Sequence, residues 1–248
     1  RFLKRAARII VATPNHVTFS PFLSAEVAER CVVIPYGIDP TRFAATPQVC
    51  AQARQLRARL GHPLVLFVGS LVYYKGLDVL IDAVRATPVH VALVGAGPLA
   101  AALRRHAREA GVAERVHFLG ELDDATLLAA YHACDVFCLP STWRSEAFGI
   151  VQLEAFACGK PVISTNLPSG VPWVNRHEET GLIVEPGRAD ALAAALQRLV
   201  ADEALRLRLG GNAAARVQCD FSADAMAAAT LRLYEQVMCE RHTVARHP

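Results

Sequence analysis

The sequence lacks a long apolar segment. None of its hydrophobic runs reaches the roughly 18 residues that a membrane-spanning helix needs, and its start does not have the pattern of a secretory signal. The chain begins with Arg1 rather than methionine, so we expect it to be part of a longer protein. We predict a soluble, cytoplasmic chain.

The sequence also has little net charge. Its 26 Lys and Arg and 23 Asp and Glu residues leave a formal charge of +3, which is too small to indicate a nucleic-acid-binding protein. Basic residues gather near the start and on one later predicted helix. These are Arg1, Lys4, Arg5 and Arg8, and then Arg54, Arg57 and Arg59. They form solvated helix faces or else contact an acidic surface such as anionic lipid, which would place the protein peripherally at the inner face of a membrane.

Patterns of cysteine ligation are absent as well. The seven Cys residues include no Cys-x-x-Cys pair and no Cys/His spacing typical of a metal site. An odd number of cysteines without a framework argues against a disulfide scaffold and favours a reducing compartment.

What the sequence does contain is a regular alternation of strand and helix patterns. Continuous apolar runs at 64–68, 90–94, 116–119, 136–139, 161–164 and 181–184 predict strands covered on both faces of a parallel sheet. Helical patterns lie between and after them, at 76–86, 99–110, 124–133, 148–158, 188–200, 203–217 and 223–239. We therefore predict an α/β fold with a Rossmann-like, doubly wound parallel sheet of about six strands.

The beginning of the chain differs from the rest. Residues 1–7 have the pattern of a helix end, 8–12 and 32–35 of two strands, and 48–60 of an arginine-rich helix. We place a domain boundary near residues 30–40, because nothing before it is long enough to be a domain. Residues 1–31 would be a remnant of another domain with its linker, 32–218 the Rossmann-like domain, and 219–248 a C-terminal helix and tail.

Two carboxylates, Glu146 and Glu154, follow the predicted strand at 136–139, on a helix expected to begin near Phe148. Eight helical residues rise about 12 Å, whereas the carboxyl groups of a glycosidase acid/base pair lie about 5–9.5 Å apart. The spacing therefore fits the two ends of one extended ligand, with helix amides near Ile150 and Val151 forming an anion site between them. Sugar, diphosphate and ribose in that order make a nucleotide sugar. The alternative is two exposed glutamates whose charge suits a first helical turn.

Several motifs in order resemble the group 1 (family 4) retaining glycosyltransferases of the GT-B fold. They are Glu146-x7-Glu154 with Phe148-Gly149 between, Val33-Ile34-Pro35-Tyr36-Gly37-Ile38-Asp39, Phe67-Val68-Gly69, Lys75-Gly76, Val94-Gly95-Ala96-Gly97-Pro98, Phe118-Leu119-Gly120, Leu139-Pro140-Ser141, Gly159-Lys160-Pro161-Val162-Ile163 and Glu179-Thr180-Gly181-Leu182. The resemblance runs from about residue 32 to 217. It implies that the chain is the C-terminal, donor-binding half of such an enzyme, and that residues 1–31 come from the acceptor-binding domain.

The resemblance also implies roles for single residues. Glu146 would meet the transferred sugar, Glu154 the ribose, and the amides near Ile150 and Val151 the diphosphate. Lys75 matches the family's phosphate-binding lysine, and a cation is needed there because the departing nucleoside diphosphate develops negative charge. No Asp-x-Asp motif is present, so we expect a metal-independent site without a cofactor.

Further positions complete the implied donor site around the catalytic Glu146 and Lys75. With Glu154, they are Gly69, Ser70, Gly95, Gly97, Leu122, Asp124, Arg144, Phe148, Gly149, Ile150 and Val151. In the loop that resembles the family's base-contacting segment, Asp124 would accept the N1 and N2 hydrogens of guanine, which favours GDP over UDP. Alternatively, Asp123 or Asp124 is simply a helix N-cap.

One position departs from the family pattern. Many members carry an arginine directly after the glycine matched by Gly69, and Ser70 stands there instead. The loss of a cation beside a diphosphate would weaken donor binding or leaving-group stabilisation by about 1–3 kcal/mol. Either Arg144 compensates, or Ser70 marks a weakened or inactive site.

The resemblance implies retaining transfer to a glycan or lipid-linked acceptor, in which the departing diphosphate takes the acceptor proton. The general pattern is closest to mannosyltransferases of surface-polysaccharide pathways. Because the acceptor domain is almost entirely outside this chain, we expect nucleotide binding with little turnover. The alternatives are a catalytically silent nucleotide-sugar module that works with a separate acceptor-binding chain, an epimerase of related fold, and a structural scaffold that binds no nucleotide.

Overall fold

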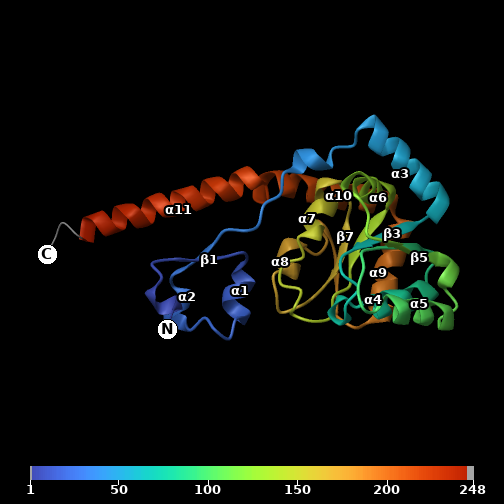
Figure 1. Ribbon diagram of the computed structural model, residues 1–248, viewed down its shortest axis with the longest axis horizontal. Coiled ribbons are helices and arrows are strands. Elements are labelled where there is room, and N and C mark those ends of the chain that lie inside the picture. The colour runs from blue at the N-terminus through green and yellow to red at the C-terminus, as the bar shows by residue number, and fades with distance from the viewer. Residues whose placement is uncertain (1, 245–248) are drawn as a thin grey trace.

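The computed structural model describes residues 2–244, with side chains as far as residue 240. Its ribbon has two parts (Figure 1). A layered α/β body extends from α3 (Pro47–Leu60) to α10 (Glu203–Asp220) and includes all elements between them. A small N-terminal unit lies beside this body. An extended segment with the short helix η2 (Pro40–Phe43) and the long helix α11 (Ala223–Val244) connect the two. The predicted tail at 245–248 lies outside the described residues.

The body is built on one parallel sheet of six strands in the order β5-β4-β3-β6-β7-β8. The strands are β3 (Leu64–Val68), β4 (His90–Val94), β5 (Val116–Gly120), β6 (Val136–Leu139), β7 (Val162–Thr165) and β8 (Gly181–Val184). All residues of β3, β6 and β7 are buried, as their continuous apolar character predicts. The winding direction reverses between β3 and β6, which are neighbours. This arrangement confirms the predicted doubly wound fold, and it makes the carboxyl ends of β3 and β6 the place where a ligand is expected.

Helices cover both faces of the sheet. On one face α4 (Leu77–Arg85) packs against α5 (Ala100–Glu109) and α9 (Ala189–Ala201). On the other, α3 packs on α6 (Asp124–Ala133), and α7 (Val151–Ala157) lies on β6 and β7. The helix α10 contacts α7 and β8, and the single-turn α8 (Val171–Val174) contacts β7.

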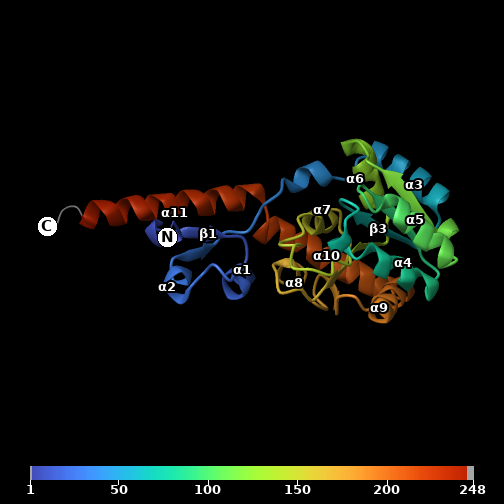
Figure 2. The same cartoon turned by 60° about the horizontal axis from the view of Figure 1, so that its bottom comes forward.

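The N-terminal unit contains a two-stranded parallel sheet, β1 (Ile9–Val11) and β2 (Cys31–Val33), with α1 (Pro14–Phe19) and α2 (Ala25–Ala28) between the strands. Both predicted strands are therefore confirmed. The predicted helix end at 1–7 is wrong, since Leu3–Arg5 forms only a 3-10 turn. Two views show α11 running beside this unit (Figures 1 and 2), where the Arg8 guanidinium pairs with Glu240 at 2.7 Å. The helix extends beyond its predicted end at 239.

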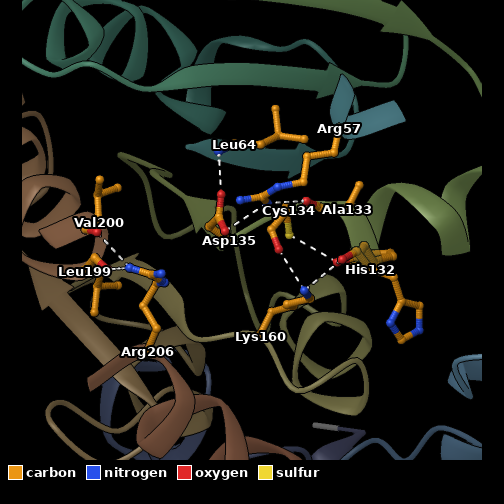
Figure 3. Close-up of polar contacts among 11 residues, drawn as sticks. Arg57, Leu64, His132, Ala133, Cys134, Asp135, Lys160, Leu199, Val200 and Arg206 are labelled. Atoms are coloured by element: carbon orange, nitrogen blue, oxygen red, sulfur yellow. Dashed lines mark hydrogen bonds and ion pairs between the residues drawn. The ribbon is translucent and has the colours of Figure 1, made fainter. Parts of the chain in front are cut away.

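A polar network ties the amino ends of the strands to the helices (Figure 3). The Asp135 carboxylate, directly before β6, accepts the Leu64 amide at 2.8 Å and pairs with Arg57 of α3 at 2.9 Å. The Lys160 ammonium, before β7, donates to the carbonyls of His132 and Cys134 at the end of α6. Because Arg57 is held in this network, at least one of the basic residues noted in the sequence has a structural partner.

Candidate functional site

A tight turn after β3 brings Lys75 to the loop after β6. The short helix η3 (Tyr73–Lys75) ends at Gly76, which has φ of 63°. A Cβ atom at Gly76 would collide with the Pro140 carbonyl oxygen. Only glycine satisfies both the backbone conformation and this close approach. The Lys75-Gly76 motif therefore joins the two loops at the point where the sheet reverses its winding.

Lys75 and Glu146, the two residues predicted to be catalytic, are in direct contact. The Lys75 Nζ atom lies 2.5 Å from Glu146 Oε2, although the two residues are 71 positions apart in the sequence. Their side chains are only 11% and 10% exposed. The Ser141 hydroxyl donates to the same carboxylate oxygen at 3.1 Å. A cation and an anion thus face each other in a nearly closed site at the carboxyl ends of β3 and β6.

The predicted glycine positions lie in the neighbouring loops. The Cα of Gly69 is next to the lysine, since a Cβ there would lie 3.5 Å from Lys75 Nζ. Gly95, after β4, has φ of 125° and packs so closely on Gly69 that a Cβ would collide with its carbonyl oxygen. Gly97 packs in the same way on the backbone of Leu71. Ser70, exposed on the rim of these loops, adds no charge beside Lys75.

The helix that carries the second glutamate begins later than predicted. Its first residue is Val151 rather than Phe148, because Gly149 adopts φ of 71°, outside the helical region. The first bonds of the turn run from Gln152 N to the Gly149 carbonyl and from Leu153 N to the Ile150 carbonyl. In the part of the chain that the structure describes, the amides of residues 149–151 donate to no protein acceptor. They are available to a ligand beside Glu146.

Phe148 supports this turn from the inside. Its ring is buried and meets the rings of Tyr36 and Phe221 edge to face, with centroids 5.0 and 6.3 Å away. The backbone between the two glutamates is therefore anchored to the extended segment before η2 and to the end of α10, while Ile150 stays 46% exposed.

Glu154 lies apart from Glu146, facing α6. The buried Tyr131 hydroxyl donates to Glu154 Oε2 at 2.5 Å. Burial raises the pKa of Glu154, and the hydrogen bond from Tyr131 opposes this rise. Glu154 lines a pocket of about 400 Å³ between η2, α6 and α7, together with Arg42, Phe43, Asp124 and Tyr131. Leu127 and Leu128 add apolar surface to this pocket, and the exposed Arg42 lies 3.6 Å from Asp124 beside it.

Of the remaining predicted residues, Leu122, Asp123 and Asp124 lie near the pocket of Glu154, whereas Arg144 lies elsewhere. Asp123 caps α6 by accepting the Thr126 amide at 2.8 Å, so the N-cap alternative is confirmed for Asp123 and not for Asp124. Asp124 itself is exposed beside the pocket of Glu154, and Leu122 lies partly buried in the preceding loop. Arg144 is not brought to Lys75, because its guanidinium donates to the Phe19 carbonyl at 3.3 Å and lines a different pocket with α1.

Sequence reasoning assigned no role to four residues that touch the site. Ser141 and Tyr131 hold the two glutamates, and Arg42 shares the pocket of Glu154. His16 of α1 places Nε2 3.0 Å from the Ala147 carbonyl, next to Glu146. Ser141 belongs to the Leu139-Pro140-Ser141 motif, which was a usable signal. The other three come from segments whose proximity only the fold reveals.

No three His, Cys, Asp or Glu side chains of the described residues are grouped in a way that would hold a metal ion. None of their helices has the length and apolar character to cross a membrane.

Comparisons with known proteins agree on one family. The model of the family "Glycosyl transferases group 1" matches residues 51–216. The chain is 39% identical over 224 residues to the D-rhamnosyltransferase WbpZ of Pseudomonas aeruginosa, covering 90% of this chain and 58% of that protein. It is 34% identical over 238 residues to the O-antigen chain mannosyltransferase C of Escherichia coli, covering 96% and 63%.

A solved structure shares the fold. Anabaena HepE, crystallised in complex with UDP, superposes with a TM-score of 0.83 at 26% identity, over 93% of this chain and 64% of that one. In each of these three comparisons the chain spans less than two thirds of the other protein's length.

Proposed function

Because the chain belongs to the group 1 glycosyltransferases, we propose that it binds a nucleotide-diphosphate sugar as the donor half of a retaining, metal-independent hexosyltransferase. One observation carries this proposal. The buried contact between Lys75 and Glu146 places a cation and a hydrogen-bond acceptor where the sheet reverses its winding, beside the unbonded amides of residues 149–151.

Each group has a task that its chemistry supports. The Lys75 ammonium and the amides of Ile150 and Val151 would bind the diphosphate and stabilise the charge that develops as it departs. Glu146 would accept hydrogen bonds from the sugar hydroxyls and Glu154 from the ribose hydroxyls. The carboxylates then orient the donor. The acceptor hydroxyl attacks on the face that the diphosphate leaves, and the diphosphate takes its proton.

GDP-mannose is the donor that we favour. Asp124 stands on the rim of the Glu154 pocket, where its carboxylate can accept from the N1 and N2 hydrogens of guanine. One similar protein is a mannosyltransferase by name. Anabaena HepE, by contrast, is described in complex with UDP, and a comparison of GDP with UDP binding distinguishes the two bases.

The acceptor would be a glycan or a lipid-linked sugar, bound by a domain that this chain does not supply. We therefore propose that the chain alone binds the donor and transfers little. The similar proteins are transferases by name, and they give no support to a catalytically silent module.

Calorimetric titration with GDP, UDP and ADP, and then with GDP-mannose and UDP-glucose, tests the proposal. We expect GDP to bind, and Lys75→Ala and Glu154→Ala each to lower its affinity at least about tenfold, the loss of one charged hydrogen bond. Lys4→Ala and Glu203→Ala change the same residue types at exposed positions away from the site, and they should bind as the parent does. If the two site variants also bind like the parent, the proposed site is wrong.

A further inference from the structure

The ion pair between Lys75 and Glu146 joins two side chains that a bound donor needs separately. Lys75 Nζ is 2.5 Å from Glu146 Oε2, and both side chains are about nine-tenths buried. Among the described residues, the Glu146 carboxylate has one other hydrogen-bond donor, the Ser141 hydroxyl. In this arrangement the two opposite charges satisfy each other, and the pair as a whole is neutral.

A nucleoside diphosphate would disturb this balance. Its phosphates carry negative charge and attract the Lys75 ammonium, which lies beside the Cα of Gly69. When Lys75 turns to the phosphate, the Glu146 carboxylate keeps only Ser141 and stays in a site with little water. A buried charge that loses its partner is strongly unfavourable. The carboxylate also repels the incoming anion directly.

An intact nucleotide sugar does not leave Glu146 in this state. Its sugar hydroxyls donate hydrogen bonds, and they would reach the carboxylate at the moment when the phosphate takes Lys75. Hydrogen bonds to a charged acceptor are among the stronger ones. Both halves of the ion pair therefore find new partners, whereas the diphosphate product provides a partner for only one.

We infer that Glu146 competes with the diphosphate for Lys75 and thereby makes the site select the sugar-bearing nucleotide over the spent nucleoside diphosphate. The inference rests on the proposed function. It gives Glu146 a task beyond contact with the sugar, because cleavage of the sugar–phosphate bond removes the hydroxyls that compensated the carboxylate. Lys75 then returns to Glu146, and the product is released.

Calorimetry with four ligands, namely GDP, UDP, GDP-mannose and UDP-glucose, tests this inference on the full chain. Glu146→Gln removes the charge and keeps the shape, so it should tighten GDP and UDP about tenfold while the two nucleotide sugars bind no more tightly than to the parent. Glu146→Ala should change the diphosphates in the same direction, so the result does not depend on one variant. Thermal unfolding of each variant verifies that it is folded.

Two controls separate competition for Lys75 from simple charge removal. Ser141→Ala takes away the other hydrogen bond of Glu146 without changing a charge, and it should not tighten the diphosphates. In a Lys75→Met background, Glu146→Gln should tighten them by clearly less than tenfold, because the lysine is no longer there to be freed.

Three results would overturn the inference. Unchanged or weaker GDP and UDP binding by Glu146→Gln and Glu146→Ala, in a chain that binds these ligands, contradicts it while the proposed function stands. Equal tightening with and without Lys75 shows that competition for the lysine plays no part. Failure of the parent chain to bind any of the four ligands removes the proposed function itself, and the inference with it.

Discussion

The two ends of the same six strands use charged side chains in opposite ways. At the amino ends, each charged group is bound to the backbone: Asp135 accepts the Leu64 amide in addition to pairing with Arg57, and Lys160 donates to two carbonyls at the end of α6 (Figure 3). At the carboxyl ends, Lys75 and Glu146 are bound to each other. The first arrangement joins elements of the fold to one another.

The carboxyl ends differ further in their backbone. Among the described residues, the amides of 149–151 have no protein acceptor, although their loop is packed firmly through Phe148. A side-chain pair can open to admit a ligand without disturbing any strand or helix, whereas a charge bonded to the backbone cannot. Buried charges occur at both ends of the sheet. What distinguishes the binding site from the structural network is whether the partner of the buried charge is a side chain or the backbone.

The largest expected effect lies at the amino ends. Asp135→Ala leaves the Leu64 amide without its acceptor in a site where the Asp135 side chain is only 14% exposed, and it leaves Arg57 with the Ala133 carbonyl as its acceptor. We expect the free energy of unfolding to fall by about 2 kcal/mol, because the Leu64 amide is left unsatisfied. Urea denaturation measures this, and the GDP affinity of the folded variant should be unchanged. Asp190→Ala breaks an exposed pair with Arg188 and should leave the urea midpoint close to that of the parent, because exposed ion pairs contribute little. A clear loss of GDP affinity in the folded Asp135→Ala variant would contradict the purely structural role of the network at the amino ends.

The strands of the sheet and the separation of the two glutamates could be predicted from the sequence. The strands at 64–68, 90–94 and 136–139 have the predicted bounds, because apolar runs covered on both faces leave one choice of position. Glu146 and Glu154 lie at two separate positions as predicted, one in contact with Lys75 and the other with Tyr131. Their assignment to sugar and ribose stays a prediction. The predicted rise of eight helical residues is wrong, because only Glu154 lies on α7.

Other parts depend on packing that the sequence does not display. The contact between Lys75 and Glu146 requires Gly76 to lie against the Pro140 carbonyl, which is a property of the folded loops. The start of α7 was misplaced because Gly149 takes a left-handed conformation in a segment with an otherwise helical pattern. The contact of Arg144 with the Phe19 carbonyl in the N-terminal unit has no signal in local periodicity, because the two residues are far apart in the sequence.

A smaller effect is expected at the carboxyl ends from Tyr131→Phe. This change removes the hydrogen bond to Glu154, which raises the pKa of that carboxyl further and leaves it less firmly oriented for a ribose. We expect GDP to bind about fivefold more weakly, equivalent to about 1 kcal/mol, as measured by calorimetry. Tyr234→Phe on α11, where the side chain is 59% exposed, is the matched control. Equal affinities of Tyr131→Phe and the parent would show that Glu154 needs no positioning.

A pair of histidines at the amino ends gives the smallest expected effect. His90 begins β4 and His117 lies in β5, with rings stacked at an interplanar angle of 6° and ring nitrogens 3.3 Å apart. Burial lowers the pKa of both, and the pKa of His90 is lowered further by His117, Arg115 and His62. A hydrogen bond from the His117 ring to the Leu60 backbone and the charge of Glu114 oppose this shift, while Arg59 lowers the pKa of His117 further.

The sign of the pH dependence follows from these shifts. Because both pKa values are lower in the folded chain than the usual 6.5, the unfolded chain binds more protons, so stability is retained above pH 6.5 and declines as the pH falls below it. The urea midpoint should therefore decrease from pH 7.5 to pH 5.5. The double variant His90→Gln/His117→Gln should show a smaller decrease. Its GDP affinity at pH 7.5 should equal that of the parent. A slope equal to that of the parent would mean that the stacked pair does not titrate on unfolding. A change in GDP affinity would instead show that the amino ends of the strands affect ligand binding at the carboxyl ends. That would contradict a purely structural role of the amino ends.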